Sequence, residues 1–125
     1  MTVKELYEHV KALMFEKKTS KDYDGYYKPW INTLLSENFD FNNALRRAKG
    51  KELLTERPYI SLDTDVIPYE PEMCYEILPY GLAKFFFVDD DLSKMNIFDT
   101  EYINAKMRYS PGYEVSIVDV YAQGE

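Results

Sequence analysis

The segment from residue 67 to residue 91 constrains the fold most, because it surrounds a strongly periodic apolar stretch with prolines. Its lead-in reads Ile-Pro-Tyr-Glu-Pro-Glu, and Pro71 with a glutamate on either side is typical of a first helical turn. Apolar or small residues then recur at helical spacing, at Met73, Cys74, Ile77, Leu78, Gly81, Leu82, Phe85 and Phe86. This pattern predicts a core helix that begins near Glu70 and packs along its whole length.

Two residues inside this predicted helix are expected to shape it. Pro79 has no backbone N–H, so it removes one hydrogen bond of the helix and favours a bend between Tyr75 and Pro79. Gly81 has no side chain, which lets a neighbouring backbone approach the helix closely. We therefore assign structural roles to Pro79 and Gly81.

The chain has the length and composition of one globular domain. Its 125 residues are enough to bury about two thirds of the unfolded surface, and no Ser/Gly-rich linker divides them. An apolar content of 46% excludes a disordered chain. The longest nearly uncharged apolar run, residues 77–88, is too short to span a bilayer, and the N-terminus reads as a polar helix rather than a signal peptide. We therefore expect no membrane association.

The first third of the chain carries two helical signals. Thr2 and Glu5 form a capping box that opens a helix over about residues 3–17. A second helix is expected over about residues 20–37, and its apolar spacing places Trp30 in the core, where we assign it a structural role. Both helices would pack against the proline-bounded helix.

A short helix, an irregular connection and a final helix complete the expected elements of the first 112 residues. A third helix is expected over about residues 42–49, with Gly50 as the residue that closes it. Residues 51–69 read as an irregular connection with at most a short extended piece around residues 59–62. A fifth helix follows the three aspartates at 89–91, and its expected inward side chains are Leu92, Met95, Phe98, Tyr102 and Ala105.

The last thirteen residues differ from the helical part, because they are rich in residues that favour β-strands. The β-formers and aromatics are Tyr113, Val115, Ile117, Val118, Val120 and Tyr121, which we take as candidate interface residues. A lone strand cannot satisfy its own backbone, so it either pairs with residues 59–62 or adds to a neighbouring subunit. The expected fold is mainly α: a helical domain of about five helices over residues 1–112 and a C-terminal β-strand arm over residues 113–125.

Charge is distributed unevenly along the chain. Residues 1–57 hold 11 Lys/Arg and 9 Asp/Glu, whereas residues 58–125 hold 4 Lys/Arg and 13 Asp/Glu, within a total net charge of −7. An acidic surface repels phosphate backbones, which argues against sequence-specific DNA binding. Two small basic clusters, at 17–21 and 46–51, lie near expected helix ends, where cations favour the helix dipole.

The sequence contains few residues in patterns that carry chemistry. It has no Gly-rich phosphate loop, no CxxC and no HExxH pattern, and its one histidine, His9, has no evident catalytic partner. The single Cys74 lies on the apolar stripe, which predicts a small buried side chain. The aspartates at 89–91 suit either the start of a helix or a divalent cation, and we favour the helix start. We therefore predict no catalytic residue, cofactor or metal, whereas the twelve tyrosines indicate protein partners.

Three short segments carry a resemblance to a known family. They are WINTLLSE at 30–37, DVIPY at 65–69 and ILPYGLA at 77–83. Together with the order of the expected elements, they resemble the small head-tail connector proteins, also called adaptor or head-completion proteins, of tailed bacteriophages. The resemblance covers nearly the whole chain, although the β-rich C-terminal segment is less typical of that helical family.

The resemblance implies a structural protein of the virion rather than an enzyme. Such a subunit forms an oligomeric ring, usually of twelve copies, in the neck between capsid and tail, and it is synthesised in the cytoplasm of the bacterial host. Its partners are the portal protein and a tail-side neck protein, and DNA passes through the ring without sequence-specific binding.

Two further functional classes remain open at this stage. One is a small acidic inhibitor or DNA mimic that occupies a basic cleft of a host enzyme, which the acidic composition favours. The other is an enzyme that uses the aspartates at 89–91 with a metal ion.

Overall fold

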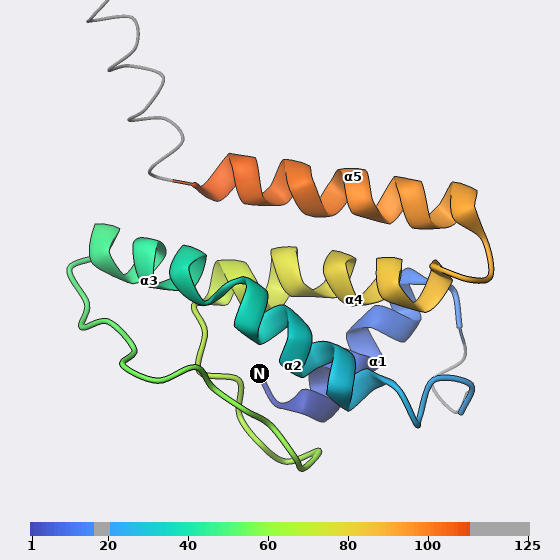
Figure 1. Cartoon of the computed structure of the whole chain (residues 1–125), viewed down its shortest axis with the longest axis horizontal. Helices are drawn as coiled ribbons and strands as arrows, with labels where there is room; N and C mark the ends of the chain where they lie inside the picture. The colour runs from blue at the N-terminus through green and yellow to red at the C-terminus, as the bar shows by residue number, and fades with distance from the viewer. Residues whose placement is uncertain (17–20, 111–125) are drawn as a thin grey trace, which may run out of the picture.

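The computed structural model of the chain describes residues 1–16 and 21–110, and Figure 1 shows that these residues are mainly helical. The helical elements, in chain order, are α1 (Val3–Leu13), α2 (Tyr27–Glu37), α3 (Phe39–Ala48), the π-helix η1 (Met73–Ile77), α4 (Leu78–Phe87) and α5 (Leu92–Tyr109). Among the described residues, β-structure is limited to an isolated antiparallel bridge between Thr2 and Val66. The predicted mainly α fold is confirmed. The predicted strand arm, residues 113–125, lies outside the described residues.

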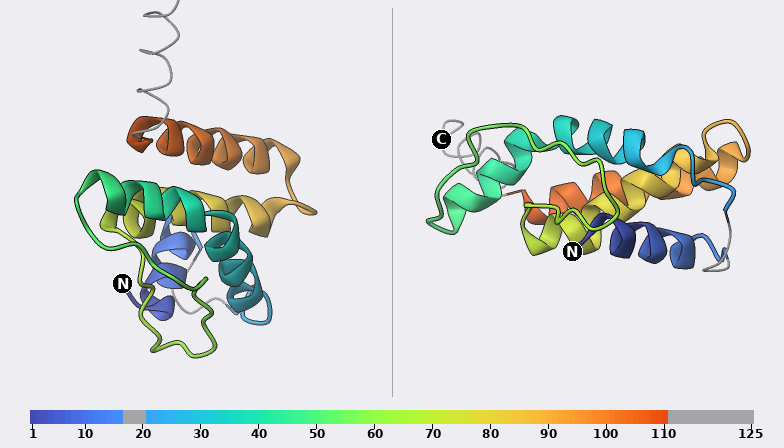
Figure 2. Two further views of the ribbon diagram at one scale, coloured as in Figure 1. Left: turned by 60° about the vertical axis from the view of Figure 1, so that its left-hand side comes forward. Right: turned by 90° about the horizontal axis from the view of Figure 1, so that it is seen from below.

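Helix α4 lies at the centre of this arrangement. It contacts α1, α2 and α5, and Figure 2 shows α5 as an outer layer that runs alongside α4. Asn38 both ends α2 and begins α3, so these two helices follow each other with one residue between them. Within the described residues, α5 therefore packs on the rest of the molecule through one side.

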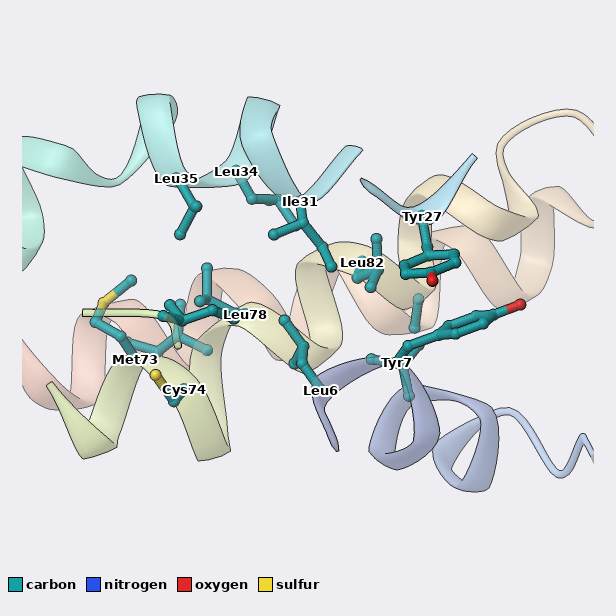
Figure 3. Close-up of a cluster of buried hydrophobic side chains, with 14 of the residues drawn as sticks. Leu6, Tyr7, Tyr27, Ile31, Leu34, Leu35, Met73, Cys74, Leu78 and Leu82 are labelled. Atoms are coloured by element: carbon teal, nitrogen blue, oxygen red, sulfur yellow. The ribbon is translucent and has the colours of Figure 1, made fainter. Parts of the chain in front are cut away.

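The hydrophobic core fills the space around α4. Figure 3 shows Ile31, Leu34 and Leu35 of α2 close to Leu78 and Leu82, and all five side chains are fully buried. Each such side chain contributes roughly 1.5–3 kcal/mol when it leaves water. The apolar stripe predicted from residue 73 onward is thus the central face of the core.

The start of this stripe is a π-helix rather than the continuous α-helix that the sequence predicted. The backbone N–H of Leu78 donates to the carbonyl oxygen of Met73, five residues earlier. Pro79 has no N–H to offer the carbonyl of Tyr75, so an α-helical bond is missing at the place where we expected a bend. The wider π-turn accommodates this missing donor, since π-turns inside helices insert one residue and shift the register.

Three helix boundaries differ from the sequence prediction. Helix α1 ends at Leu13, four residues earlier than predicted. The backbone N–H groups of Phe15 and Glu16 donate back to the last turn of the helix, and these bonds terminate it. Helix α2 begins at Tyr27 rather than near residue 20, which places Pro29 in the first turn, where its missing N–H breaks no helical bond. Helix α3 begins at Phe39 instead of residue 42.

Asparagine side chains hold the irregular connection between α3 and η1. Asn32 donates to the carbonyl of Ile60 (2.9 Å) and accepts from its N–H (2.8 Å). Asn43 makes the same pair of bonds with Leu54, at 3.1 and 2.9 Å. Figure 2 shows the connection running back along α2 before it enters η1. Side chains of α2 and α3 thus act as the partners that a β-sheet would otherwise provide.

The predicted extended piece at residues 59–62 has little free backbone to offer an added strand. The N–H of Ile60 donates to Asn32, and the N–H groups of Ser61 and Leu62 both donate to Asp65 Oδ2, at 2.8 and 2.9 Å. A strand pairs through the N–H groups of alternate residues, so pairing of the C-terminal segment with this piece, one of the two alternatives from the sequence, would break either the bond of Ser61 or those of Ile60 and Leu62. The structure therefore disfavours that alternative.

Several side chains are less buried than the sequence predicted, Trp30 and Leu92 among them. Trp30 is half-buried, not central: its ring lies 5.3 Å from that of Phe86 and 5.7 Å from that of Phe85, whereas Tyr26, its third aromatic neighbour, is exposed. Leu92, expected to face inward, is 64% exposed at the first position of α5. Apolar spacing cannot separate an inward from an outward residue at the end of a helix, because apolar side chains also occur on protein surfaces.

Gly81 lies where α2 and α5 both approach α4. A Cβ atom at this position would lie 2.8 Å from Leu34 Cδ2 and 3.0 Å from Tyr102 Cε1. The predicted close approach is present, but side chains make it, not a neighbouring backbone. Gly81 is therefore required by packing rather than by its own backbone conformation.

Candidate interface

The end of α1 carries a phenylalanine in a backbone conformation that usually belongs to glycine. Phe15 has a φ of 60°, in the left-handed region. Its N–H donates to the carbonyl of Ala12 (3.1 Å), and the N–H of Glu16 donates to that of Lys11 (2.8 Å). This pair of bonds is the Schellman motif that closes a helix. A residue with a Cβ pays roughly 1–2 kcal/mol in this region.

Helix α3 ends in the same motif with a glycine. Gly50 has a φ of 72° and donates to the carbonyl of Arg47 (3.1 Å), and Lys51 donates to that of Arg46 (2.9 Å). The predicted closing role of Gly50 is confirmed. Phe15 holds the equivalent position in α1 and is 97% exposed, so burial does not offset its strain. A strained and exposed aromatic residue indicates a role beyond closing the helix.

Phe15 stands beside an apolar groove between the end of α1 and the start of α5. The groove has a volume of about 200 Å³ and is lined by Leu13, Met14, Phe15, Phe87, Lys94, Ile97 and Phe98. The rings of Phe87 and Phe98 stack with centroids 5.7 Å apart. Lys94 brings its Nζ atom to 5.4 Å from the centre of the Phe87 ring. The groove, which we call the Phe15 groove, thus combines aromatic and aliphatic walls with one positive charge.

Exposed apolar side chains line this groove. Phe15 is 97% exposed and Ile97 is 61% exposed, and both belong to its lining. Single exposed apolar residues are ordinary on soluble proteins, but a group of them around a groove marks an interaction surface. The Phe15 groove is the candidate functional site of the described residues.

Sequence reasoning did not find this site. The prediction carried the first helix on to residue 17, which placed Phe15 inside a helix and hid its strained position. A glycine or asparagine at position 15 would have marked the end of α1, as Gly50 marks that of α3. The sequence does contain one indication that α1 ends here, because its helical spacing of apolar residues stops at Met14.

The basic cluster at residues 46–51 is used inside the subunit. Glu70 is 3% exposed, and its carboxylate accepts from Lys51 (2.8 Å), Lys49 (3.1 Å) and Arg46 (3.1 Å). Burial alone would raise the pKa of Glu70, but the hydrogen bonds and charges of Lys51 and Lys49 outweigh it and lower the pKa. Lys49 also pairs with Glu72 at 2.8 Å. This cluster fixes the end of α3 to the start of the π-helical segment.

A second polar cluster joins α1 to α2. The rings of Tyr7 and Tyr27 stack with centroids 4.0 Å apart. Tyr7 donates its hydroxyl hydrogen to Asp24 (2.9 Å), and Tyr27 donates to Asp63. Burial, followed by these carboxylate hydrogen bonds, raises the pKa of both phenols, so both stay protonated donors. The donors and acceptors of this cluster satisfy one another, which is typical of a structural network.

The remaining predicted residues lie away from the Phe15 groove. Pro79 and Gly81 belong to the buried face of α4, and the six interface candidates, Tyr113, Val115, Ile117, Val118, Val120 and Tyr121, lie outside the described residues. His9 is exposed on α1. Asp91 begins α5 by accepting from the N–H of Lys94 (3.1 Å), so the helix-start interpretation is confirmed for this residue. Burial raises the pKa of the Cys74 thiol to about 11, which keeps it protonated.

In residues 1–16 and 21–110, no group of three or more His, Cys, Asp or Glu side chains is placed to hold a metal ion. Over the same residues, none of the helices combines the length and apolar character needed to cross a membrane.

Comparison with known proteins gives no match to a family model, to a curated protein or to a solved structure. The resemblance to head-tail connector proteins therefore stays a hypothesis.

Proposed function

We propose that the protein is a structural subunit of an oligomeric assembly, and more specifically a head-tail connector subunit of a tailed bacteriophage. The observation that carries the proposal is Phe15, a strained aromatic that is 97% exposed beside an apolar groove. Large aromatic residues act as anchors when they enter a partner's surface. The groove is also poor in the polar groups that orient a small substrate, since its one charged lining side chain among the described residues is Lys94.

A closed ring needs two different complementary faces on each subunit. The Phe15 groove supplies a candidate for one of them. The outer side of α5 supplies a candidate for the other, because Ile103 and Met107 are exposed there while Tyr102 and Ala105 are buried against the molecule. A helix with apolar residues on two sides is typical of a helix that is covered on both.

The resemblance supplies the remaining parts of the proposal. In it, about twelve copies form a ring below the portal, in the virion neck, and contact the portal protein and a tail-side neck protein. The net charge of −7 supports a channel through which DNA passes, since an acidic wall repels phosphates and does not hold them. Residues 113–121 serve as an assembly arm in this proposal.

The second candidate is an acidic inhibitor that mimics DNA. A mimic presents free carboxylates on one face, but several described carboxylates are used inside the subunit. Asp63 pairs with Lys28 (3.3 Å), Asp99 with Lys84 (2.9 Å), and Asp65 accepts two backbone N–H groups. These internal bonds support the connector over the mimic.

Replacing Phe15 with glycine tests the proposal. Glycine removes the strain, so Phe15→Gly should stabilise the monomer by roughly 1–2 kcal/mol. The same change removes the anchor, so it should weaken assembly by about tenfold or more, as for a residue worth over about 1.4 kcal/mol of binding. Urea unfolding measures the first effect, and mass photometry over a range of concentrations measures the second.

Tyr59→Ala is the matched control, because Tyr59 is an exposed aromatic residue that does not line the Phe15 groove. It should leave assembly unchanged. Assembly of Phe15→Gly at wild-type concentrations would refute the role of Phe15. A wild-type chain that stays monomeric, both alone and with a portal, would refute the connector function and favour the mimic.

A further inference from the structure

We propose that the Phe15 groove receives residues 113–117 from the C-terminal segment of a neighbouring copy of the chain. This inference rests on the proposed function, because it assumes that the chain assembles with itself. It adds the place at which one copy holds the next and the side chains that recognise the segment.

The described residues leave a strand little opportunity to add through its backbone. Their one β-contact is the isolated bridge between Thr2 and Val66. The N–H groups of Ile60, Ser61 and Leu62 are already donated to side chains of the same subunit. A segment that docks on this part of a copy therefore binds mainly through side chains, which requires an apolar groove.

The chemistry of the segment matches that of the groove. Tyr113, Val115 and Ile117 alternate with Glu114 and Ser116, so in an extended segment the three apolar side chains share one face. Residues 111–125 contain no Lys or Arg and three acidic residues. The groove offers the complement, since its walls are apolar and its charged side chain is the cation Lys94.

The reach of the segment favours a neighbouring copy over the same chain. At the helical rise of 1.5 Å per residue, Tyr109 lies roughly 18 Å along α5 from Ile97. Four residues span at most about 14 Å, so even a fully extended segment would leave the backbone of Tyr113 short of Ile97 in its own subunit. The groove of another copy has no such limit, which favours it as the site for Tyr113, Val115 and Ile117 together.

The strain at Phe15 fits this arrangement. A left-handed Phe15 projects its ring into solvent at the edge of the groove, where residues 1–16 and 21–110 of its own subunit leave it almost fully exposed. A bound segment would cover the ring, and burial of an aromatic side chain contributes on the order of the strain that the left-handed conformation costs.

Disulfide trapping between two variants that each carry one added cysteine tests the inference. Full-length Ile97→Cys is mixed with full-length Val115→Cys under mild oxidation, and the native Cys74 stays in both because it is buried. Tyr59→Cys replaces Ile97→Cys in the control mixture, since Tyr59 is exposed and does not line the groove. We expect the cross-linked heterodimer to form at least about tenfold faster with Ile97→Cys, because docking raises the local thiol concentration.

Charge reversal gives a second readout. Lys94→Glu, added to the Ile97→Cys chain, should slow trapping, since Lys94 is the cation of the groove and its side chain is exposed. Equal trapping by Ile97→Cys and Tyr59→Cys in an oligomeric sample would overturn this inference alone. A third variant carries both Ile97→Cys and Val115→Cys in one chain. If the disulfide forms only within this chain and not between copies, the segment binds its own subunit and the inference is overturned as well. A monomeric wild type would overturn the inference together with the proposed function.

Discussion

Replacing Gly81 with alanine tests the packing of α4 between α2 and α5. The added Cβ would lie 2.8 Å from Leu34 Cδ2 and 3.0 and 3.2 Å from two ring carbons of Tyr102. Contacts below about 3.4 Å are repulsive, so both neighbours would have to move. Leu34 is fully buried among other side chains of the core.

Tyr102 has little freedom to give way. Its hydroxyl accepts from Asn38 (2.8 Å) and donates to Glu37 (2.8 Å), so a shift of the ring would stretch two hydrogen bonds. Overpacking of this kind costs roughly 2–3 kcal/mol, whereas alanine gains about 1 kcal/mol over glycine inside a helix. We therefore expect Gly81→Ala to destabilise the fold by about 1–2 kcal/mol, and Gly81→Leu to cost more.

Urea unfolding followed by tryptophan fluorescence measures this effect. Trp30 is the single tryptophan, and its ring lies 5.7 Å from Phe85 and 5.3 Å from Phe86, both on α4. Gly25→Ala is the control, because a Cβ at Gly25 meets no atom within 4 Å. A Gly81→Ala variant with the wild-type urea midpoint or a higher one would refute the reasoning. The core would then have room for the added methyl group, contrary to these distances.

Two further predictions concern Pro79 in α4 and Glu70, which lies just before η1. Pro79→Ala restores the missing N–H donor and should change stability by no more than about 1–2 kcal/mol, because a gained hydrogen bond is set against a forced change of the π-turn; urea midpoints measure it. Glu70→Gln should cost about 1–2 kcal/mol at neutral pH, since the partner cations are partly exposed. Because the pKa of Glu70 is lowered in the folded protein, its carboxylate stabilises the fold at pH values above 4.5, the ordinary pKa of a glutamate. This stabilisation is lost as the pH falls from 4.5 through the lowered pKa of the folded state. Melting temperatures below pH 4.5 should therefore fall less steeply for Glu70→Gln than for the wild type.

Hydrophobic spacing predicted the core because the same spacing determines which side of a helix packs. Leu78 and Leu82 are four residues apart on α4 and are both fully buried, as a helical stripe requires. The method fails at the ends of elements, where packing on one side no longer constrains the sequence. Leu92 and Phe15 are both such cases: both are exposed, and Phe15 lines the candidate interface.

Hydrophobic periodicity could not predict the π-helix or the ordered path of the irregular connection, for a different reason. Pro79 signals a lost hydrogen bond but not how the helix accommodates the loss, which depends on the surrounding packing. The connection is ordered by partners far away in sequence: Asn32 holds Ile60, and Asn43 holds Leu54. A polar residue on a helix face reads as solvent-exposed until the structure shows what it binds.

The way this connection is held also bears on where partners bind. Ordering a residue costs about 1–2 kcal/mol of backbone entropy, so a long connection without regular structure needs many fixed points. Besides the two asparagines, Tyr69 donates its hydroxyl to the carbonyl of Leu35, and Arg57 donates to that of Ser36. These side chains of the connection and of α2 and α3 bind each other, so the backbone groups that they hold are not free to bind a partner. Apolar side chains are exposed on the connection itself, as well as along α5 and at the end of α1. At the end of α1 they line a groove, and a partner that fills the groove would remove this apolar surface from water.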